Sequence, residues 1–221
     1  MIEYLQHNRI RLALHTLKPG PGRALLLLHG LGERAPRTLP ADCAGWPGAV
    51  HALDFTGHGE SQIPRGGGYT CELLLADADI ALARLGEATV CGRGLGGYIA
   101  LLLAGARPQA VHGAILRDGP GLSGGGTHTK HPYIPVVDTS RVGAPDPFAL
   151  ADLATDARPP SYAAHYAMLA DMRSPLPRPV TLCAREQPEW LVAVTAALGL
   201  EWTAFDDALQ AYAHAPHGQP S

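Results

Sequence analysis

The sequence predicts an α/β domain with a mostly parallel central sheet. Short apolar runs alternate along the chain with longer stretches whose apolar residues have helical spacing, which is the pattern of strands joined by crossover helices. The chain has 221 residues, a length that suits one domain with a sizeable core and is short for two. We therefore expect a single domain over residues 1–221.

The predicted strands begin with a hairpin over Ile2–Leu5 and Ile10–Thr16, which is followed by a turn-rich stretch at residues 18–22. The next run, Ala24–Leu28, is continuously apolar and too short for a typical helix, so it predicts a strand covered on both faces. Further short apolar runs predict strands over Ala49–Leu53, Ala88–Cys91, Ala114–Leu116, Val180–Cys183 and Leu200–Ala204.

Helical spacing predicts helices over Cys71–Leu85, Leu95–Ala106 and Trp190–Leu198. Residues 119–179 differ, because they are rich in glycine and proline and contain one convincing helix, around Tyr162–Asp171. Loops of this length in compact domains are lids, binding segments or disordered regions. We expect a reduced, partly irregular lid over the functional site.

Charge and cysteine content narrow the classes of function. The net charge is −3, and lysine and arginine form no cluster, so we expect no nucleic-acid partner. The four cysteines are widely spaced, which suits a reducing, cytoplasmic compartment. The N-terminus has no basic-then-apolar leader, and the longest apolar stretch, Leu95–Ala106, is too short to span a bilayer. We expect no membrane span, and the sequence leaves the oligomeric state open.

The most informative motif follows the strand predicted at Ala88–Cys91. Residues 92–96 read Gly-Arg-Gly-Leu-Gly and lead into the helix predicted at Leu95–Ala106. In a G-x-S-x-G nucleophile elbow, a strand-to-helix turn holds a serine at the middle position. Here the middle residue is Gly94. Glycine adopts strained backbone conformations without steric cost, so the turn can persist without a nucleophile.

Two more motifs precede the elbow in the expected order. His29 and Gly30 follow the strand at Ala24–Leu28, and the loop Asp54–Ser61 contains a G-x-G-x-S pattern. With these three motifs the chain resembles the α/β-hydrolase fold superfamily of serine esterases and lipases, over about residues 10–205. The resemblance implies a mostly parallel sheet with helices on both faces.

The resemblance also implies an oxyanion hole, in which backbone N–H groups after the His-Gly motif and after the elbow bind a carbonyl oxygen. The positions implied to form this hole or to bind a ligand are His29, Gly30, Leu31, Arg93 and Leu95. His29, like His58 in the second loop, is expected to serve in hydrogen bonding rather than in proton transfer.

The chain departs from the catalytic triad of this superfamily, whose members follow the order serine, carboxylate, histidine. Gly94 cannot form an acyl intermediate, and Cys91, the nearest thiol, is expected to point into the core. Two candidates exist for the carboxylate. Glu186 follows the strand at Val180–Cys183, and Asp118 follows the strand at Ala114–Leu116; each can equally be a solvated loop carboxylate.

The histidine is also ambiguous. His214 lies near the C-terminus, as a catalytic histidine should, but about ten residues after the last predicted strand. An alternative alignment places Asp207 in the histidine's position and leaves His214 and His217 in a frayed tail. His128 and His131 have no cysteine or carboxylate at a ligand spacing beside them, so we expect neither a metal nor another cofactor.

Two classes of function remain open. The first is a degenerate hydrolase, a pseudoenzyme that binds a small apolar or carbonyl-containing ligand, or a partner protein. The second is a hydrolase or lyase that acts on a small acyl, ester or carbonyl substrate by non-covalent acid–base catalysis. A third hypothesis concerns origin, namely that Gly94 replaces the serine of an otherwise active serine hydrolase. Because position 94 is glycine, we do not expect serine acyl-enzyme chemistry from this chain.

Overall fold

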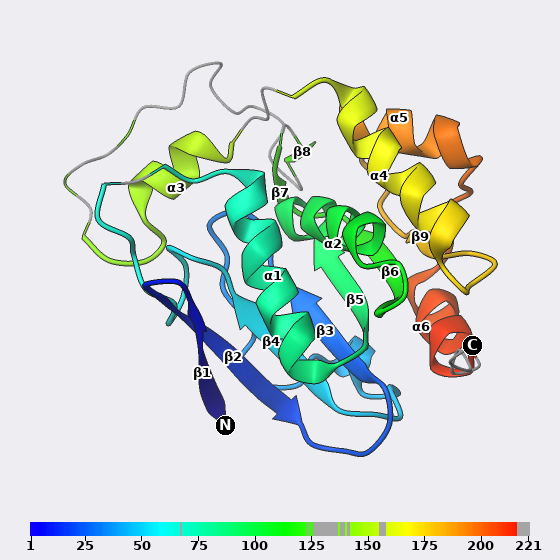
Figure 1. Cartoon of the computed structure of the whole chain (residues 1–221), viewed down its shortest axis with the longest axis horizontal. Helices are drawn as coiled ribbons and strands as arrows, with labels where there is room; N and C mark the ends of the chain where they lie inside the picture. Colours follow the sequence, from blue (N-terminus) through cyan, green and yellow to red (C-terminus); the bar gives the residue numbers. More distant parts are fainter. Residues whose placement is uncertain are drawn as a thin grey trace.

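The computed structural model describes residues 1–66, 68–122, 124–125, 137, 140, 142–154 and 158–215. Its centre is a seven-stranded sheet with the order β1-β2-β4-β3-β5-β6-β9 (Figure 1). The strands β4, β3, β5, β6 and β9 run parallel to one another, and β2 is antiparallel to both of its neighbours, β4 and β1. The seven strands are β1 (Ile2–His7), β2 (Ile10–Lys18), β3 (Ala24–Leu28), β4 (Val50–Asp54), β5 (Ala88–Arg93), β6 (Val111–Arg117) and β9 (Val180–Leu182).

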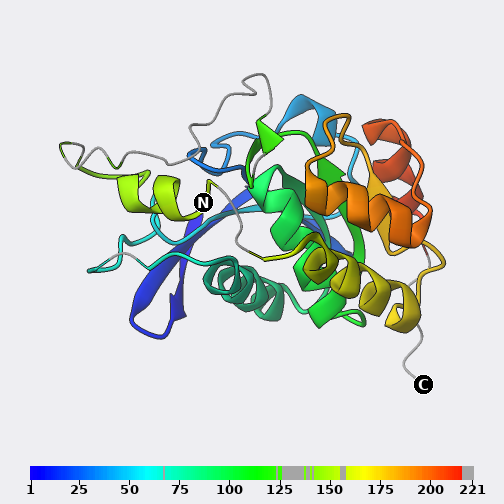
Figure 2. The ribbon, with the colours of Figure 1, turned by 90° about the horizontal axis from the view of Figure 1, so that it is seen from above.

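Helices cover both faces of this sheet, and Figure 2 shows α1 and α4 on one side with α6 on the other. The helices are α1 (Cys71–Leu85), α2 (Leu95–Ala106), α3 (Pro147–Asp152), α4 (Pro160–Arg173), α5 (Glu189–Leu198) and α6 (Phe205–Ala213), with one 3₁₀ helix at Ala41–Cys43. A two-stranded sheet, β7 (Pro120–Gly121) with β8 (Gly124–Gly125), follows β6. The predicted fold class is confirmed.

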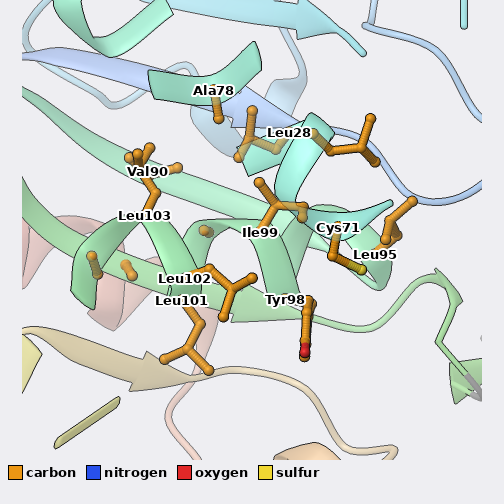
Figure 3. Close-up of a cluster of buried hydrophobic side chains, with 14 of the residues drawn as sticks. Leu28, Cys71, Ala78, Val90, Leu95, Tyr98, Ile99, Leu101, Leu102 and Leu103 are labelled. Atoms are coloured by element: carbon orange, nitrogen blue, oxygen red, sulfur yellow. The ribbon is translucent and has the colours of Figure 1, made fainter. Parts of the chain in front are cut away.

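Alternating residues along the central strands divide the core into two layers, as the period of a strand requires. Leu26 and Leu28 of β3 pack with α1, α2, α4 and α5, whereas Leu25 and Leu27 pack with α6 and the segment around Trp46. The helix α2 is buried on every side, and Figure 3 shows its leucines packed among Val90, Leu28 and Ala78. The elbow therefore lies at the entrance to the central helix of the core.

Most predicted elements are present within a few residues of their expected bounds. The strand predicted at Leu200–Ala204 is wrong, because only Trp202 pairs there, in an isolated parallel bridge with Leu182. The short helices α3 and α6 were not predicted. They have only six and nine residues, too few for a clear helical period in the sequence.

The helix predicted at Tyr162–Asp171 forms as α4, but it lies in the helical layer, packed against α2 and α5, rather than over the site. Small residues allow this close packing: a Cβ at Gly105 of α2 would lie 2.4 Å from the backbone oxygen of Tyr166. The lid stays a prediction for the rest of residues 119–179. The loop histidines His128 and His131 and the tail residue His217 lie outside the described residues. Among the described residues, no helix is long and apolar enough to cross a membrane.

The position of α2 leads to a prediction about stability. Leu102 is completely buried, so Leu102→Ala should lower the free energy of unfolding by about 2–5 kcal/mol through lost burial and a residual cavity. Val192, whose exposed fraction is 50%, provides the control, since Val192→Ala should change it by about 0.5 kcal/mol or less. Denaturant titration of both variants measures these differences. Equal losses in the two variants would contradict the central place assigned to α2.

Candidate functional site

The turn between β5 and α2 has the strained geometry expected of a nucleophile elbow. Gly94, the N-cap of α2, has φ +50° and ψ −116°, a conformation that residues with side chains rarely adopt. Its N–H donates to the backbone oxygen of Arg117 at 3.0 Å, and its carbonyl accepts from the N–H of Tyr98 at 3.0 Å. The backbone thus keeps the turn although no nucleophile stands on it.

The space that a side chain at position 94 would need is occupied by the chain itself. We call residues 118–122, which follow β6, the plug segment. A Cβ at Gly94 would lie 2.3 Å from the carbonyl carbon of Gly119 and 2.4 Å from the carbonyl oxygens of Gly119 and Pro120. Real Cβ atoms do not approach backbone this closely. A serine at position 94 therefore does not fit this arrangement, and the hypothesis of a simple serine replacement in an intact site is not supported.

The plug segment also occupies the N–H group implied for the oxyanion hole. The N–H of Leu31 donates to the backbone oxygen of Pro120 at 2.9 Å. A Cβ added to Gly121 would lie 2.8 Å from the Cβ of Leu31, 2.9 Å from the Cβ of Leu95 and 3.5 Å from the nitrogen of Leu95. The His-Gly loop and the elbow therefore meet beside Gly94, with the plug segment between them. The carbonyl of Pro120 is thus the partner of the first N–H group that the resemblance implies for the oxyanion hole.

Little room remains at the elbow. The space beside Gly94 measures about 20 Å³ and is lined in part by Asp118, Glu186 and Trp190. This holds about one water molecule, whereas pockets for small molecules measure roughly 300–1,000 Å³. The structure brings both candidate carboxylates to the elbow, and the space that the described residues leave there is too small for a substrate.

Asp118 has a structural role in this arrangement. Its carboxylate accepts from the N–H groups of Arg185 and Glu186 at 2.9 Å each, which ties the loop after β6 to the loop after β9. Glu186 is partly buried beside it. Neither carboxylate has a hydrogen bond to a histidine within the part of the chain that the structure describes.

His214, the candidate base, lies near the amino ends of the parallel strands, at the end of the sheet away from Gly94. It is exposed at the end of α6, where its Nδ1 bonds to the backbone oxygen of Gln210 at 2.8 Å. The guanidinium of Arg23, just before β3, donates to the backbone oxygens of the flanking residues Tyr212 and Ala215. Arg23 lies at the amino ends of the parallel strands, whereas Gly94 follows β5 at their carboxyl ends. A five-residue strand such as β3 is about 16 Å long, so His214 and Gly94 are separated by about this distance. This placement favours the alternative in which His214 has no role at Gly94.

The start of α6, by contrast, lies at the carboxyl edge of the sheet, because the ring of Phe205 packs 3.9 Å beneath the guanidinium carbon of Arg117. Asp207, in the first turn of α6, is exposed. The short connection after Trp202 accounts for both placements, since the chain enters a helix immediately and carries its later residues away from the elbow.

The two motif histidines are structural. The Nε2 of His29 accepts from the N–H of Phe55 at 3.2 Å, so its Nδ1 carries the proton and donates to the backbone oxygen of Gly30 at 2.7 Å. His58 accepts from the N–H of Gly32 through Nε2 and donates to the oxygen of Thr56. Burial lowers the pKa of both, that of His58 to about 4. The ring nitrogens of both residues are thus engaged in hydrogen bonds to backbone groups, as expected.

Cys91 is also inert. It is buried in the core layer beneath β3, and burial raises the pKa of its thiol to about 11. A thiol of this kind is protonated at neutral pH and is a poor nucleophile.

A large cavity lies next to the elbow, at the same carboxyl edge. It measures about 700 Å³ and opens over the ends of β3, β5 and β6. The connection between β3 and β4 contains only the 3₁₀ helix at Ala41–Cys43, and this thin cover leaves room for the cavity. Its floor is apolar, and its walls carry several charged side chains. The apolar lining includes Leu27, Leu28, Pro36, Pro40, Cys43 and Cys91; the charged lining comprises Glu33, Arg34, Arg37, Asp42, Glu60, Arg93 and Arg117.

Of the positions implied by the resemblance, His29 and Arg93 line this cavity, and Gly30 uses its N–H for Glu33 at 2.9 Å. Sequence analysis missed the plug segment and Arg117. The adjacent Gly119-Pro120-Gly121 was the available signal, because glycines on both sides of a proline permit close backbone contact.

Among the described residues, no group of three or more histidine, cysteine or carboxylate side chains could hold a metal ion.

Comparisons with known proteins agree with the fold. The family model Hydrolase_4, described as serine aminopeptidase, S33, matches residues 19–126. A thioesterase domain from the curacin biosynthetic pathway superposes with a TM-score of 0.66, at 16% identity, over 96% of each chain. With the sheet order and the three motifs, these matches show that the chain has the α/β-hydrolase fold.

Two other solved structures match only in part. A probable hydrolytic enzyme from Pseudomonas aeruginosa has 28% identity and a TM-score of 0.47, over 52% of this chain and 40% of that one. An epoxide hydrolase from Vigna radiata has 19% identity and a TM-score of 0.46, over 64% of this chain and 45% of that one. The chain thus covers less than half the length of these two proteins. No curated protein matches the sequence.

The close contact at Gly94 predicts an unusually large cost for a side chain there. Gly94→Ala adds overpacking against the plug segment to backbone strain, which together should lower the free energy of unfolding by about 2–5 kcal/mol. Gly199, with φ +61° and nothing within 4 Å of an added Cβ, is the matched control, and Gly199→Ala should cost about 1–2 kcal/mol from strain alone. Denaturant titration tests the difference; equal costs would argue against the plug.

The buried histidines predict acid sensitivity. Because burial lowers the pKa of His58 in the folded state to about 4, below its ordinary value of 6.5, the unfolded state binds more protons between these values. Stability should therefore fall as pH falls from 6.5 to 4, with at most about 1.4 kcal/mol per pH unit from His58. His58→Gln, which keeps a donor and an acceptor, should flatten this slope in unfolding titrations at several pH values. An unchanged slope would show that other groups dominate.

Proposed function

We propose that this protein is a degenerate member of the α/β-hydrolase superfamily that lacks serine acyl-enzyme chemistry and binds a small carbonyl-containing ligand. The observation that carries this proposal is the occupied elbow: Gly94 has no nucleophile, and the carbonyls of Gly119 and Pro120 fill the space in front of it. The ligand site in this proposal is the neighbouring cavity of about 700 Å³, whose volume suits a small organic molecule.

Acyl transfer needs a nucleophile, a base within hydrogen-bond reach and free donors for the oxyanion. Here the N–H of Leu31 is bonded to Pro120, Asp118 holds two backbone N–H groups, and His214 lies at the other edge of the sheet. His29 lines the large cavity, but both of its ring nitrogens are engaged with backbone groups. The described part of the chain thus favours binding over acid–base catalysis.

A reactivity assay tests the proposal. The protein should not be labelled by a fluorophosphonate and should give no burst with p-nitrophenyl acetate, since a burst requires an acyl-enzyme to accumulate. An active serine esterase is the positive control. Stoichiometric labelling would overturn the proposal, and mapping of the label to Ser61 or Cys91 would show that the nucleophile has moved.

Restoring the serine tests the same proposal from the other side. Gly94→Ser should gain no esterase turnover, because the new side chain meets the plug segment and has no general base nearby. Circular dichroism establishes that the variant is folded. A large gain that disappears in the double variant Gly94→Ser/His214→Ala would identify His214 as a base and contradict the placement described above.

A further inference from the structure

We propose that the large cavity binds a small organic acid. In this proposal the guanidinium groups of Arg93 and Arg117 hold the carboxylate, and the apolar part of the ligand lies along Leu27 and Leu28. The inference rests on the proposed function, because it assigns a ligand chemistry to the cavity named there. It narrows the ligand of that proposal to a molecule whose recognised group carries a full negative charge.

The two arginines stand side by side. Arg93 and Arg117 are the last residues of β5 and β6, and they are register partners in this parallel pair. Neighbouring strands are about 4.8 Å apart, and both side chains line the same cavity. A planar guanidinium presents paired N–H donors that match the two oxygens of a carboxylate. The sheet edge therefore offers two such groups to one space.

Arg117 is held in place before any ligand arrives. Its guanidinium carbon lies 3.9 Å from the centre of the Phe205 ring, and its Nη2 donates to Asp42 at 2.8 Å. The bond to Asp42 uses one of the five N–H donors of the guanidinium. Because the side chain is already ordered, a ligand that binds it loses less free energy to side-chain ordering.

Arg93 is positioned more loosely. Its Nη2 lies 3.2 Å from Glu33, whose other carboxylate oxygen accepts from the N–H of Gly30 at 2.9 Å. The Arg93 side chain is half exposed, so its remaining donors can reach a ligand. The carboxylates of Glu33 and Asp42 offset the repulsion between the two guanidinium groups in the empty cavity.

The charge count of the lining favours an anion. Four arginines and three carboxylates line the cavity, which leaves one formal positive charge. Arg37 pairs with Glu60 at 2.6 Å, whereas Arg34, exposed at the wall, has no ion-pair partner among the described residues. One bound carboxylate makes the lining neutral overall. The apolar floor then accommodates the rest of the molecule.

The competing explanation is that these ion pairs only fasten the loop at residues 31–43 to the strand ends. That explanation predicts that loss of an arginine changes stability and leaves ligand affinity unrelated to ligand charge. Phenylacetate and its neutral isostere phenylacetamide distinguish the two, because they share size and apolar surface and differ in charge. Calorimetric titration and amide shifts in nitrogen-edited NMR spectra give affinity and location.

Phenylacetate should bind saturably, at least tenfold more tightly than phenylacetamide, with shifts at the amides of His29 and Arg93, and more weakly as salt rises. Arg93→Gln and Arg117→Gln should each weaken phenylacetate binding at least tenfold and leave phenylacetamide unchanged. Arg117→Lys, which keeps the charge and loses the paired donors, should also weaken it. Arg107→Gln, which breaks an exposed ion pair with Asp79 at the other end of α2, is the control that should change nothing.

Equal binding of the two compounds, or unchanged affinity in both glutamine variants, would overturn the carboxylate inference and leave the cavity as the proposed ligand site. Binding of neither compound at 10 mM would overturn both. Labelling by a fluorophosphonate would overturn the proposed function independently of either result.

Discussion

The hydrogen bond from the N–H of Leu31 to the carbonyl of Pro120 joins the three parts on which the site depends: the His-Gly loop, the plug segment and the elbow. It brings the backbone of Gly119 against Gly94 so closely that neither residue can carry a side chain without movement of the other. The glycine at position 94 and the path of the plug segment therefore depend on each other.

Strained turns often persist because a catalytic residue needs them. Here the turn at Gly94 has a second reason to persist, which is the packing of β5, α2 and β3. A Cβ at Gly92 would lie 2.0 Å from the oxygen of Gly96, and one at Gly96 would lie 2.4 Å from the oxygen of Leu28. These contacts join the central strand to the completely buried helix α2. The elbow is part of the core, so its backbone geometry does not depend on a nucleophile at position 94.

The space for a ligand has a different origin from the elbow. The connection between β3 and β4 lacks an α-helix, and the loop that replaces it is fastened to the sheet by polar contacts, including the bond from the N–H of Ala35 to Asp54 at 2.7 Å. A loop held in this way lies over the carboxyl ends of the strands and leaves a cavity between itself and the sheet. The charged ends of β5 and β6 then face a cavity, whereas the elbow beside them packs against the plug segment.

The sequence by itself determined the fold class, the strands and helices around Ala24–Leu28 and Leu95–Ala106, and the glycine at the elbow. These features depend on local periodicity and on motifs whose residues lie close together in the chain. Tertiary structure alone decided that Pro120 occupies the N–H of Leu31, that α6 carries His214 to the far edge, and that Arg93 stands beside Arg117. Each of these pairings joins residues far apart in the sequence, and strand register and loop path, which no local pattern encodes, bring them together.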